Sequence, residues 1–206
     1  MAKLTVPGLG RFNVIDESNY RALANDRSTT VLRGYQGRNY ERHPFGSMPW
    51  GSMPFRTIPR SEWRDRIEEG HAKKTFPIYH QLAKRVPVLN QKRLPYCWAY
   101  AVAGAVQSVR ACVGFPTRHL SATSFAAPGK RYREEGGWTG EAIGYAGEYG
   151  IATCDTWPEA VCDRRYFDGS REEAKEHNVG QWFELRPKTF DEIMTCLLSN
   201  YPVCVG

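Results

Sequence analysis

The pattern of hydrophobic and polar positions in this chain is organised around one extended lead followed by one long helical segment. Pro87 and Pro95 disfavour helix in the lead, because a proline ring fixes its own φ and restricts the residue before it. After the lead, small and apolar side chains recur every three or four residues, which is the spacing of one helical stripe. The pattern predicts a helix whose buried stripe is formed by Cys97, Ala101, Ala105, Val109 and Cys112.

Weaker patterns surround this helix. Residues 66–85 predict two short helical halves, and residues 139–150 predict a helix closed by Gly150. A further helix is expected at residues 190–198, with Ile193, Met194 and Leu197 facing inward. The remaining expectations are a helical candidate at 17–25, a loop at 123–133, a solvated loop or helix at 167–178, and short strands at 182–185 and 201–205.

An unusual repeat precedes the helices. Prolines and aromatic residues each return every fifth residue, in the units PFGSM, PWGSM and PFRTI. This proline spacing excludes a helix or a central strand, so the segment cannot bury itself by local folding. It is either a flexible linker or a strap whose aromatic anchors occupy pockets of its own domain or of a partner, and linkers are usually poor in aromatics. The anchors are Tyr35, Tyr40, Phe45, Trp50 and Phe55.

The formal net charge of +6 belongs to the first part of the chain. Residues 1–85 contain 15 Lys and Arg against 8 Asp and Glu, whereas residues 86–206 contain 13 against 14. A basic arm can meet nucleic acid, an anionic membrane surface or an acidic protein face, or simply aid solubility. The arginines are dispersed and no nucleic-acid-binding signature accompanies them, so we do not expect nucleic acid as a partner.

The cysteines and the amino terminus indicate a compartment. All six cysteines follow residue 96, and no CxxC or Cys/His spacing suggests a metal site. Residues 1–10 lack the apolar core of a signal peptide, and no apolar run is long enough to span a membrane. We therefore expect six thiols in a reducing, cytoplasmic setting or within an intracellular assembly such as a virion, and no secretion through a signal peptide.

Cys97 opens the central helix, and this position favours the reactive form of a thiol. The first turn of a helix carries the positive end of the macrodipole and unpaired N–H groups, which stabilise a thiolate. Cys97 is therefore a candidate nucleophile. The alternative is a small buried cysteine in a core helix, because free cysteines are among the most buried residue types.

The stretch NQKRLPYCWAY resembles the active-site stretch of papain-like cysteine proteases. In that family a glutamine lies six residues before a Cys-Trp-Ala sequence that opens a long helix, and here these residues are Gln91, Cys97, Trp98 and Ala99. Residues 58–64 resemble the start of the mature protease. Further pieces follow in family order, namely Leu120-Ser121, Gly136-Gly137-Trp138, Tyr149-Gly150-Ile151, Thr156-Trp157-Pro158 and Tyr201-Pro202-Val203-Cys204-Val205.

The resemblance implies an α+β, papain-like fold in which the helical half is complete and the β-barrel-like half only begins. Residues 1–57 would then be a non-globular arm, and residues 58–206 a peptidase domain that is incomplete at its carboxy terminus. Cys97 would be the nucleophile and Gln91 an oxyanion donor, and neither a cofactor nor a metal is implied. The substrate-binding residues would be Gly136, Gly137, Trp138 and Trp98, although the two glycines could equally form a plain turn.

The resemblance does not supply a catalytic base. The family's catalytic histidine and asparagine follow the strand that residues 201–205 resemble, which is where this sequence stops. A further part could follow Gly206, another polypeptide could complete the fold, or the domain could be a structural remnant. We expect each histidine of the chain on the surface, namely His43, His71, His80, His119 and His177.

Two functions are compatible with these observations. The leading interpretation is a cysteine peptidase that hydrolyses peptide bonds through an acyl-thioester at Cys97. The alternative is a catalytically inactive papain-like protein that serves as a structural or assembly element, for example in a virion. The expected partners are a peptide or protein substrate if the chain is active, a protein that contacts the aromatic arm, and a protein that completes the strand edge at residues 201–205.

Overall fold

The structure of the chain is a computed structural model that divides it into two units, Met1–Val31 and Leu32–Gly206. The helical candidate at 17–25 and the first four aromatic anchors of the arm lie outside the residues that it describes. The described residues are 3–6, 10–13, 53, 55–185 and 189–204.

The first unit contains one pair of antiparallel strands among its described residues. These strands are β1, Lys3–Val6, and β2, Gly10–Asn13, and Thr5 lies opposite Arg11 in their register. No strand pattern was assigned to this segment from the sequence. The pairing joins residues close in the chain, so its closure costs little entropy.

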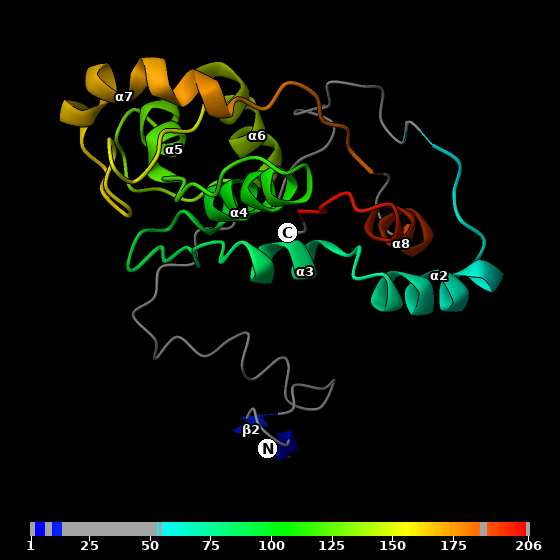
Figure 1. Cartoon of the computed structure of the whole chain (residues 1–206). Helices are drawn as coiled ribbons and strands as arrows, with labels where there is room; N and C mark the ends of the chain where they lie inside the picture. Colours follow the sequence, from blue (N-terminus) through cyan, green and yellow to red (C-terminus); the bar gives the residue numbers. More distant parts are fainter. Residues whose placement is uncertain (1–2, 7–9, 14–52, 54, 186–188, 205–206) are drawn as a thin grey trace. The chain divides into compact units, whose positions relative to one another are not determined.

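The named elements in the described part of the second unit are helices joined by loops (Figure 1). The expected helices at 139–150 and 190–198 are present, as are the two short helices of the insertion, although the first of these begins earlier than expected. In chain order the helices are α2 Arg60–Ala72, α3 Pro77–Ala83, α4 Cys97–Cys112, α5 Thr123–Gly129, α6 Thr139–Tyr149, α7 Phe167–Ala174 and α8 Phe190–Leu198, with short 3₁₀ turns at Arg164–Tyr166 and Lys175–His177.

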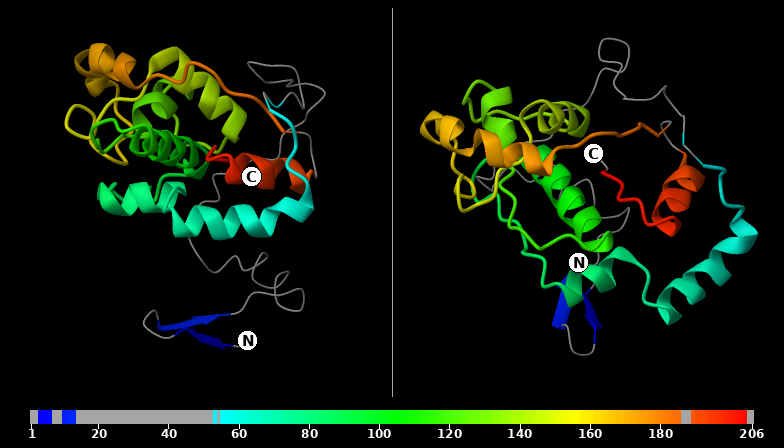
Figure 2. Two further views of the ribbon diagram at one scale, coloured as in Figure 1. Left: turned by 45° about the vertical axis from the view of Figure 1, so that its right-hand side comes forward. Right: turned by 45° about the horizontal axis from the view of Figure 1, so that its top comes forward.

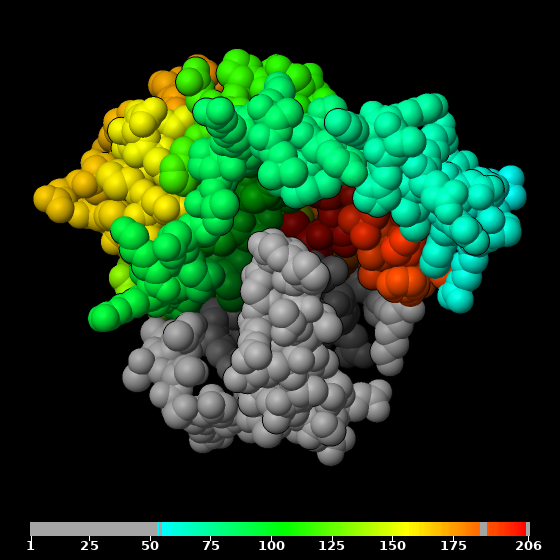
Figure 3. All heavy atoms as spheres, turned by 60° about the horizontal axis from the view of Figure 1, so that its bottom comes forward, coloured from blue at the N-terminus to red at the C-terminus, as the bar shows by residue number. Residues whose placement is uncertain are grey.

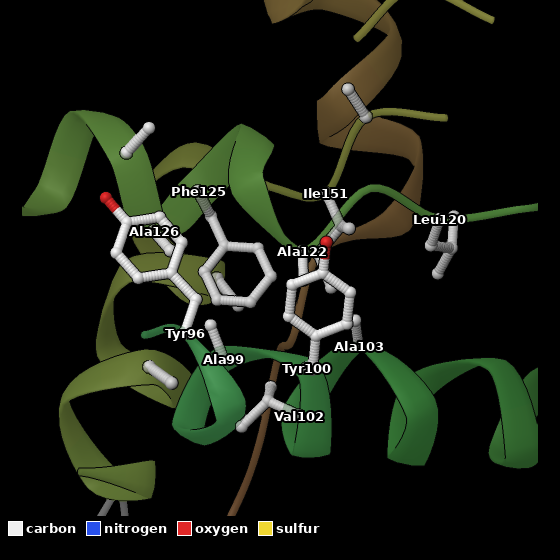
Figure 4. Close-up of a cluster of buried hydrophobic side chains, with 14 of the residues drawn as sticks. Tyr96, Ala99, Tyr100, Val102, Ala103, Leu120, Ala122, Phe125, Ala126 and Ile151 are labelled. Carbon is white, nitrogen blue, oxygen red and sulfur yellow. The ribbon is translucent and has the colours of Figure 1, made fainter. Parts of the chain in front are cut away.

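Helix α4 is the centre of this unit and lies between α3 and α6 (Figure 2). Large buried rings pack among buried alanines, whose small side chains let the helix backbones approach one another. Tyr96, Tyr100 and Phe125 gather at the start of α4 (Figure 4). Each large side chain that is fully buried here contributes about 1.5–3 kcal/mol to folding before entropy costs.

The buried face of α4 is not the expected one. Its buried apolar residues are Trp98, Ala99, Tyr100, Val102, Ala103 and Ala111, whereas Ala101 is exposed and Val109 is 40% exposed. Small residues occupy both faces of this helix, so the indole of Trp98 decides which face turns inward. Cys97 is half-buried and shares the more exposed face of the helix with Ala101 and Val109.

The loop expected at 123–133 is wrong for its first half, which forms α5. Phe125 and Ala126 are completely buried, and the Ser124 hydroxyl donates to the carbonyl of Ser121 over 2.7 Å and accepts from the N–H of Ala152 over 3.0 Å. Tertiary packing therefore holds a helix that local propensity does not favour.

The strands expected at 182–185 and 201–205 are not formed in the described residues 182–185 and 201–204. A strand needs a neighbouring strand for its hydrogen bonds. Within residues 55–185 and 189–204, the β-pairing that joins two described residues is a single isolated bridge, between Leu120 and Thr153. The described part of this unit is thus helix-rich, and the expected start of a β-barrel-like half is not seen in it.

Helix α8 packs against α2 and the residues before it, as the red and cyan atoms in Figure 3 show. Arg60 forms an ion pair with Asp191 over 2.7 Å, and the N–H of Ile58 donates to the Thr195 hydroxyl over 3.0 Å. The expected inward face of α8 is wrong in part, because Leu197 is 43% exposed. The buried residues of α8 are Glu192, Thr195 and Cys196.

Candidate active site

Cys97 is the first residue of α4 and is half-buried. The carbonyl oxygen of Tyr96 accepts the N–H groups of Ala99 and Tyr100, at 2.9 and 3.0 Å. The N–H groups of Cys97 and Trp98 come earlier in the helix than these two donors. At a helix start, unpaired N–H donors and the macrodipole stabilise an anion. The thiol therefore combines partial access with a position at the amino-terminal end of a long helix.

Burial raises the pKa of each of the other five thiols. Burial raises the pKa of the Cys154 thiol to about 12, and the carboxylates of Glu159 and Asp155 add to that effect. Burial also raises the pKa of Cys196 and of Cys204 to about 11. The pKa values of the remaining two thiols are raised mainly by burial as well, and these are Cys112 and Cys162. Because only the thiolate is nucleophilic, these five groups are poor nucleophiles near neutral pH.

Gln91 lies in a tight turn just before the helix. Its side-chain Nε2 donates to the carbonyl of Leu94 over 3.0 Å, and the Leu94 N–H donates back to the Gln91 carbonyl over 3.0 Å. A glutamine amide has two N–H donors, so the bond to Leu94 uses one of them. The side chain is half-buried, so the second donor can serve a bound oxygen near the turn.

Glu159 is a site residue that no sequence pattern indicated. One of its carboxylate oxygens accepts the backbone N–H of Asn90 over 2.7 Å and lies 3.4 Å from Nε2 of His119. This contact fixes the backbone next to Gln91. The two partners are 69 residues apart in the chain, so no local spacing reveals them.

Trp98 is buried, with 1% of its surface exposed. Its Nε1–H donates to the carbonyl of Pro95 over 3.1 Å, and its ring meets that of Tyr96 edge to face with 5.6 Å between centroids. In this structure the indole is part of the wall that supports Cys97, and its surface is turned to the core.

Gly137 is buried against the indole of Trp98. A Cβ atom at this position would lie 2.7 Å from Cε2 of Trp98 and 2.9 Å from a carboxylate oxygen of Glu141, closer than real Cβ contacts. The structure thus brings the Gly136-Gly137 segment to the start of α4. Trp138 is half-buried and extended, with φ −139° and ψ 157°, and it directly precedes α6.

Three of the described histidines have hydrogen-bond or ion-pair partners other than Cys97. His71 bonds the Tyr79 hydroxyl over 2.7 Å, His119 lies beside Glu159, and His177 bonds the carbonyl of Ile151 over 3.0 Å. The surface expectation is wrong for His177, which is 3% exposed because α7 and the following 3₁₀ turn fold onto the core. In the part of the chain that the structure describes, no hydrogen bond or ion pair joins a histidine to Cys97; His43 lies outside that part.

Two properties of the described residues bear on metals and membranes. No group of three or more His, Cys, Asp or Glu residues is placed among them to hold a metal ion. None of their helices is long and apolar enough to cross a membrane.

Comparison with known proteins finds papain-like cysteine proteases among solved structures. Digestive procathepsin L 3 of the Tenebrio molitor larval midgut is 24% identical with a TM-score of 0.38, covering 49% of this chain and 33% of its own. A structure from work on the mite allergens Blo t 1 and Der p 1 is 17% identical with a TM-score of 0.40, covering 74% of this chain and 45% of its own. This chain therefore spans less than half the length of either structure. No family model and no curated protein matches the sequence.

Proposed function

We propose that this unit is the helical half of a papain-like cysteine peptidase domain, with Cys97 as its nucleophile. In the reaction the thiolate sulfur bonds to the substrate carbonyl carbon, the C–N bond breaks, and the amine leaves with a proton from a general acid. The oxyanion would be held by an N–H of Gln91 and the backbone N–H of Cys97. Water then releases the acyl group and restores the thiol.

One observation carries this proposal: Cys97 is half-buried and is the first residue of a long helix, a position that none of the other five thiols has. Two further contacts support it. The Gln91 turn is held beside this start by Glu159 through Asn90, and Gly137 packs against Trp98, the residue after the nucleophile. The general acid and base are not assigned to any described residue.

A second candidate function is a catalytically inactive structural element of a large assembly, such as a virion. It is favoured by the contacts of His71, His119 and His177, which hold these rings on partners other than Cys97. Without a positioned imidazole the leaving amine receives no proton. In this case Cys97 would occupy the position of the family's nucleophile but would not hydrolyse peptides.

Alkylation by iodoacetamide at pH 6 tests the proposed nucleophile, with the modified residues identified by mass spectrometry. We expect Cys97 to react faster than the five other cysteines, because the helix start favours its thiolate. Cys112 is the matched control, since it is also half-buried but lies at the opposite end of the same helix. Equal rates at Cys97 and Cys112 would argue against a prepared nucleophile and favour the structural alternative.

A further inference from the structure

Lys130 is a buried cation at the end of α5, with 10% of its side chain exposed. Its Nζ lies 2.7 and 2.8 Å from the two carboxylate oxygens of Glu141 and 4.0 Å from an oxygen of Glu135. Lysine is seldom buried without a partner, and a buried ion pair is weak evidence for stability because desolvation offsets the attraction. The role of this ion pair is therefore sought in the groups that it holds in place.

The ion pair touches both parts of the candidate site. Nζ of Lys130 lies 5.2 Å from the centre of the Trp98 ring, within the range of a cation–π contact. A carboxylate oxygen of Glu141 lies against Gly137, where a Cβ would approach it to 2.9 Å. The hydroxyl of Tyr145 donates to Glu141 over 2.9 Å and fixes the carboxylate from a third side.

We infer that Lys130 is a positioning residue for peptide substrates. Together with Glu141 it sets the spacing between the Gly136-Gly137 backbone, where an extended peptide would lie, and the start of α4, where Cys97 lies. The inference rests on the proposed function. Glu135 directly precedes the paired glycines and faces the same ammonium, so Lys130 has a carboxylate on either side of that segment.

Loss of the Lys130 charge should change peptide binding more than thiol reactivity. Without the ammonium, the Glu141 carboxylate is drawn toward water and the adjoining Gly137 backbone moves with it. Misplacement of a substrate by about 1 Å can cost on the order of a hundredfold in rate. Thiol reactivity depends on the N–H groups at the start of α4, whereas the Lys130 ammonium contacts the ring of Trp98 there.

The test compares two reagents on the full 206-residue chain. Iodoacetamide reports the thiol alone, whereas a dipeptidyl chloromethyl ketone must also bind through its peptide backbone before sulfur displaces chloride. A single change that removes the Lys130 charge would leave Glu141 buried without its partner and could unfold the protein. The test variant is therefore Lys130→Met with Glu141→Gln, which removes both charges and keeps an acceptor for Tyr145.

The double variant should lower the rate of the peptidyl reagent at Cys97 by about tenfold or more, a fraction of the cost of a 1 Å misplacement. Its iodoacetamide rate should stay within about twofold of wild type, because that reagent requires no peptide site. Lys130→Arg should restore most of the peptidyl rate. Lys175→Met is the matched control, since Lys175 also lies 2.7 Å from a carboxylate, that of Glu172, but on the exposed surface.

The outcomes distinguish failure of this inference from failure of the proposed function. An unchanged ratio of the two rates in the folded double variant would overturn the inference, as would a wild-type Cys97 that shows no preference for the peptidyl reagent over iodoacetamide. Failure of the proposed function has a different signature, namely a wild-type Cys97 that reacts with iodoacetamide no faster than Cys112.

Discussion

The Nδ1 atom of His177 lies 3.0 Å from the carbonyl oxygen of Ile151. This bond holds the turn after α7 against the segment that follows α6. A second bond joins the same two parts, because the N–H of Ile151 donates to the carbonyl oxygen of Ala174 over 3.0 Å. Burial lowers the pKa of His177, and the nearby guanidinium of Arg110 lowers it further. A neutral imidazole that donates Nδ1–H to the carbonyl satisfies this arrangement.

The first prediction concerns pH. The folded-state pKa of His177 lies below its unfolded value, so the unfolded chain binds this proton first and acid favours unfolding. The stabilisation is fully present above the unfolded pKa, ordinarily near 6.5, and is lost as pH falls through and below it. His177→Gln should therefore reduce the loss of unfolding free energy between pH 7.5 and pH 5, roughly the window in which histidine titrates. Urea unfolding at the two pH values measures this.

His71→Gln is the control for this prediction, because His71 is exposed and its ring bonds the hydroxyl of Tyr79. It should leave the pH dependence close to that of the wild type. Identical pH dependence in the His177→Gln variant and the wild type would mean that protonation of His177 carries no folding penalty.

The second prediction concerns the contact between Gly137 and Trp98. Gly137→Ala should lower the free energy of unfolding by about 1–3 kcal/mol, because the new methyl group overpacks a buried site against the indole and a carboxylate. Gly169→Ala is the matched control in α7, where a Cβ meets nothing within 4 Å, and it should be neutral or stabilising by about 0.5–1 kcal/mol. Chemical unfolding of both variants decides. Equal stability of the two variants would show that the Gly136-Gly137 segment can move away from Trp98.

Elements with a strong local signal could be predicted from the sequence. The bounds of α8 and the end of α6 at Gly150 were predicted, and at Gly150 φ is +73°, a conformation that suits glycine. Helix α5 could not be predicted, because Pro128 and Gly129 indicate a loop and its stability comes from burial of Phe125. The buried face of α4 was mispredicted because small residues on both of its faces give little contrast.

The candidate site divides in the same way. Cys97 and Gln91 stand six residues apart in one local motif, so a single stretch of sequence contains both. Lys130, Glu141 and Glu159 act through partners brought together only by the fold, and charged residues are ordinarily expected on the surface. No spacing in the sequence marks a lysine whose partner belongs to another helix.

The third prediction is that the 206-residue chain by itself has little or no peptidase activity. No described histidine is bonded to Cys97, and proton transfer by a positioned acid and base typically contributes about 10² to 10⁴ in rate. Hydrolysis of an unstructured fluorogenic peptide measures this, with Cys97→Ala as the background. Robust cleavage that this substitution abolishes would show that a histidine of the chain does serve as base.

The final prediction concerns the aromatic arm, of which the structure describes Met53 and the residues from Phe55 onward. The ring of Phe55 lies 5.0 Å from that of Tyr201 and 6.2 Å from that of Phe183, and Sδ of Met53 lies 3.9 Å from the thiol of Cys196. Phe55 therefore packs on its own domain, as the strap interpretation predicts for an aromatic anchor.

A buried aromatic side chain contributes about 1.5–3 kcal/mol, whereas fixing one residue of backbone costs about 1–2 kcal/mol, so one aromatic per five residues does not hold an arm by itself. Met53, at the end of the preceding unit, and the buried Ile58 add further contacts. We therefore expect trypsin to cut after Arg56 slowly in the free chain. Cleavage between Arg33 and Arg42 should be fast in the free chain and suppressed once a partner covers the arm.

Phe55→Ala should accelerate the cut after Arg56 about tenfold or more, the equivalent of about 1.4 kcal/mol. The control is Phe115→Ala, at a ring already 54% exposed, which should leave the rate of this cut unchanged. Mass spectrometry of the early products decides between the cases: slow cleavage throughout in the free chain would mean that the whole arm packs on its own domain, and fast cleavage after Arg56 in the wild type would reduce the arm to a linker.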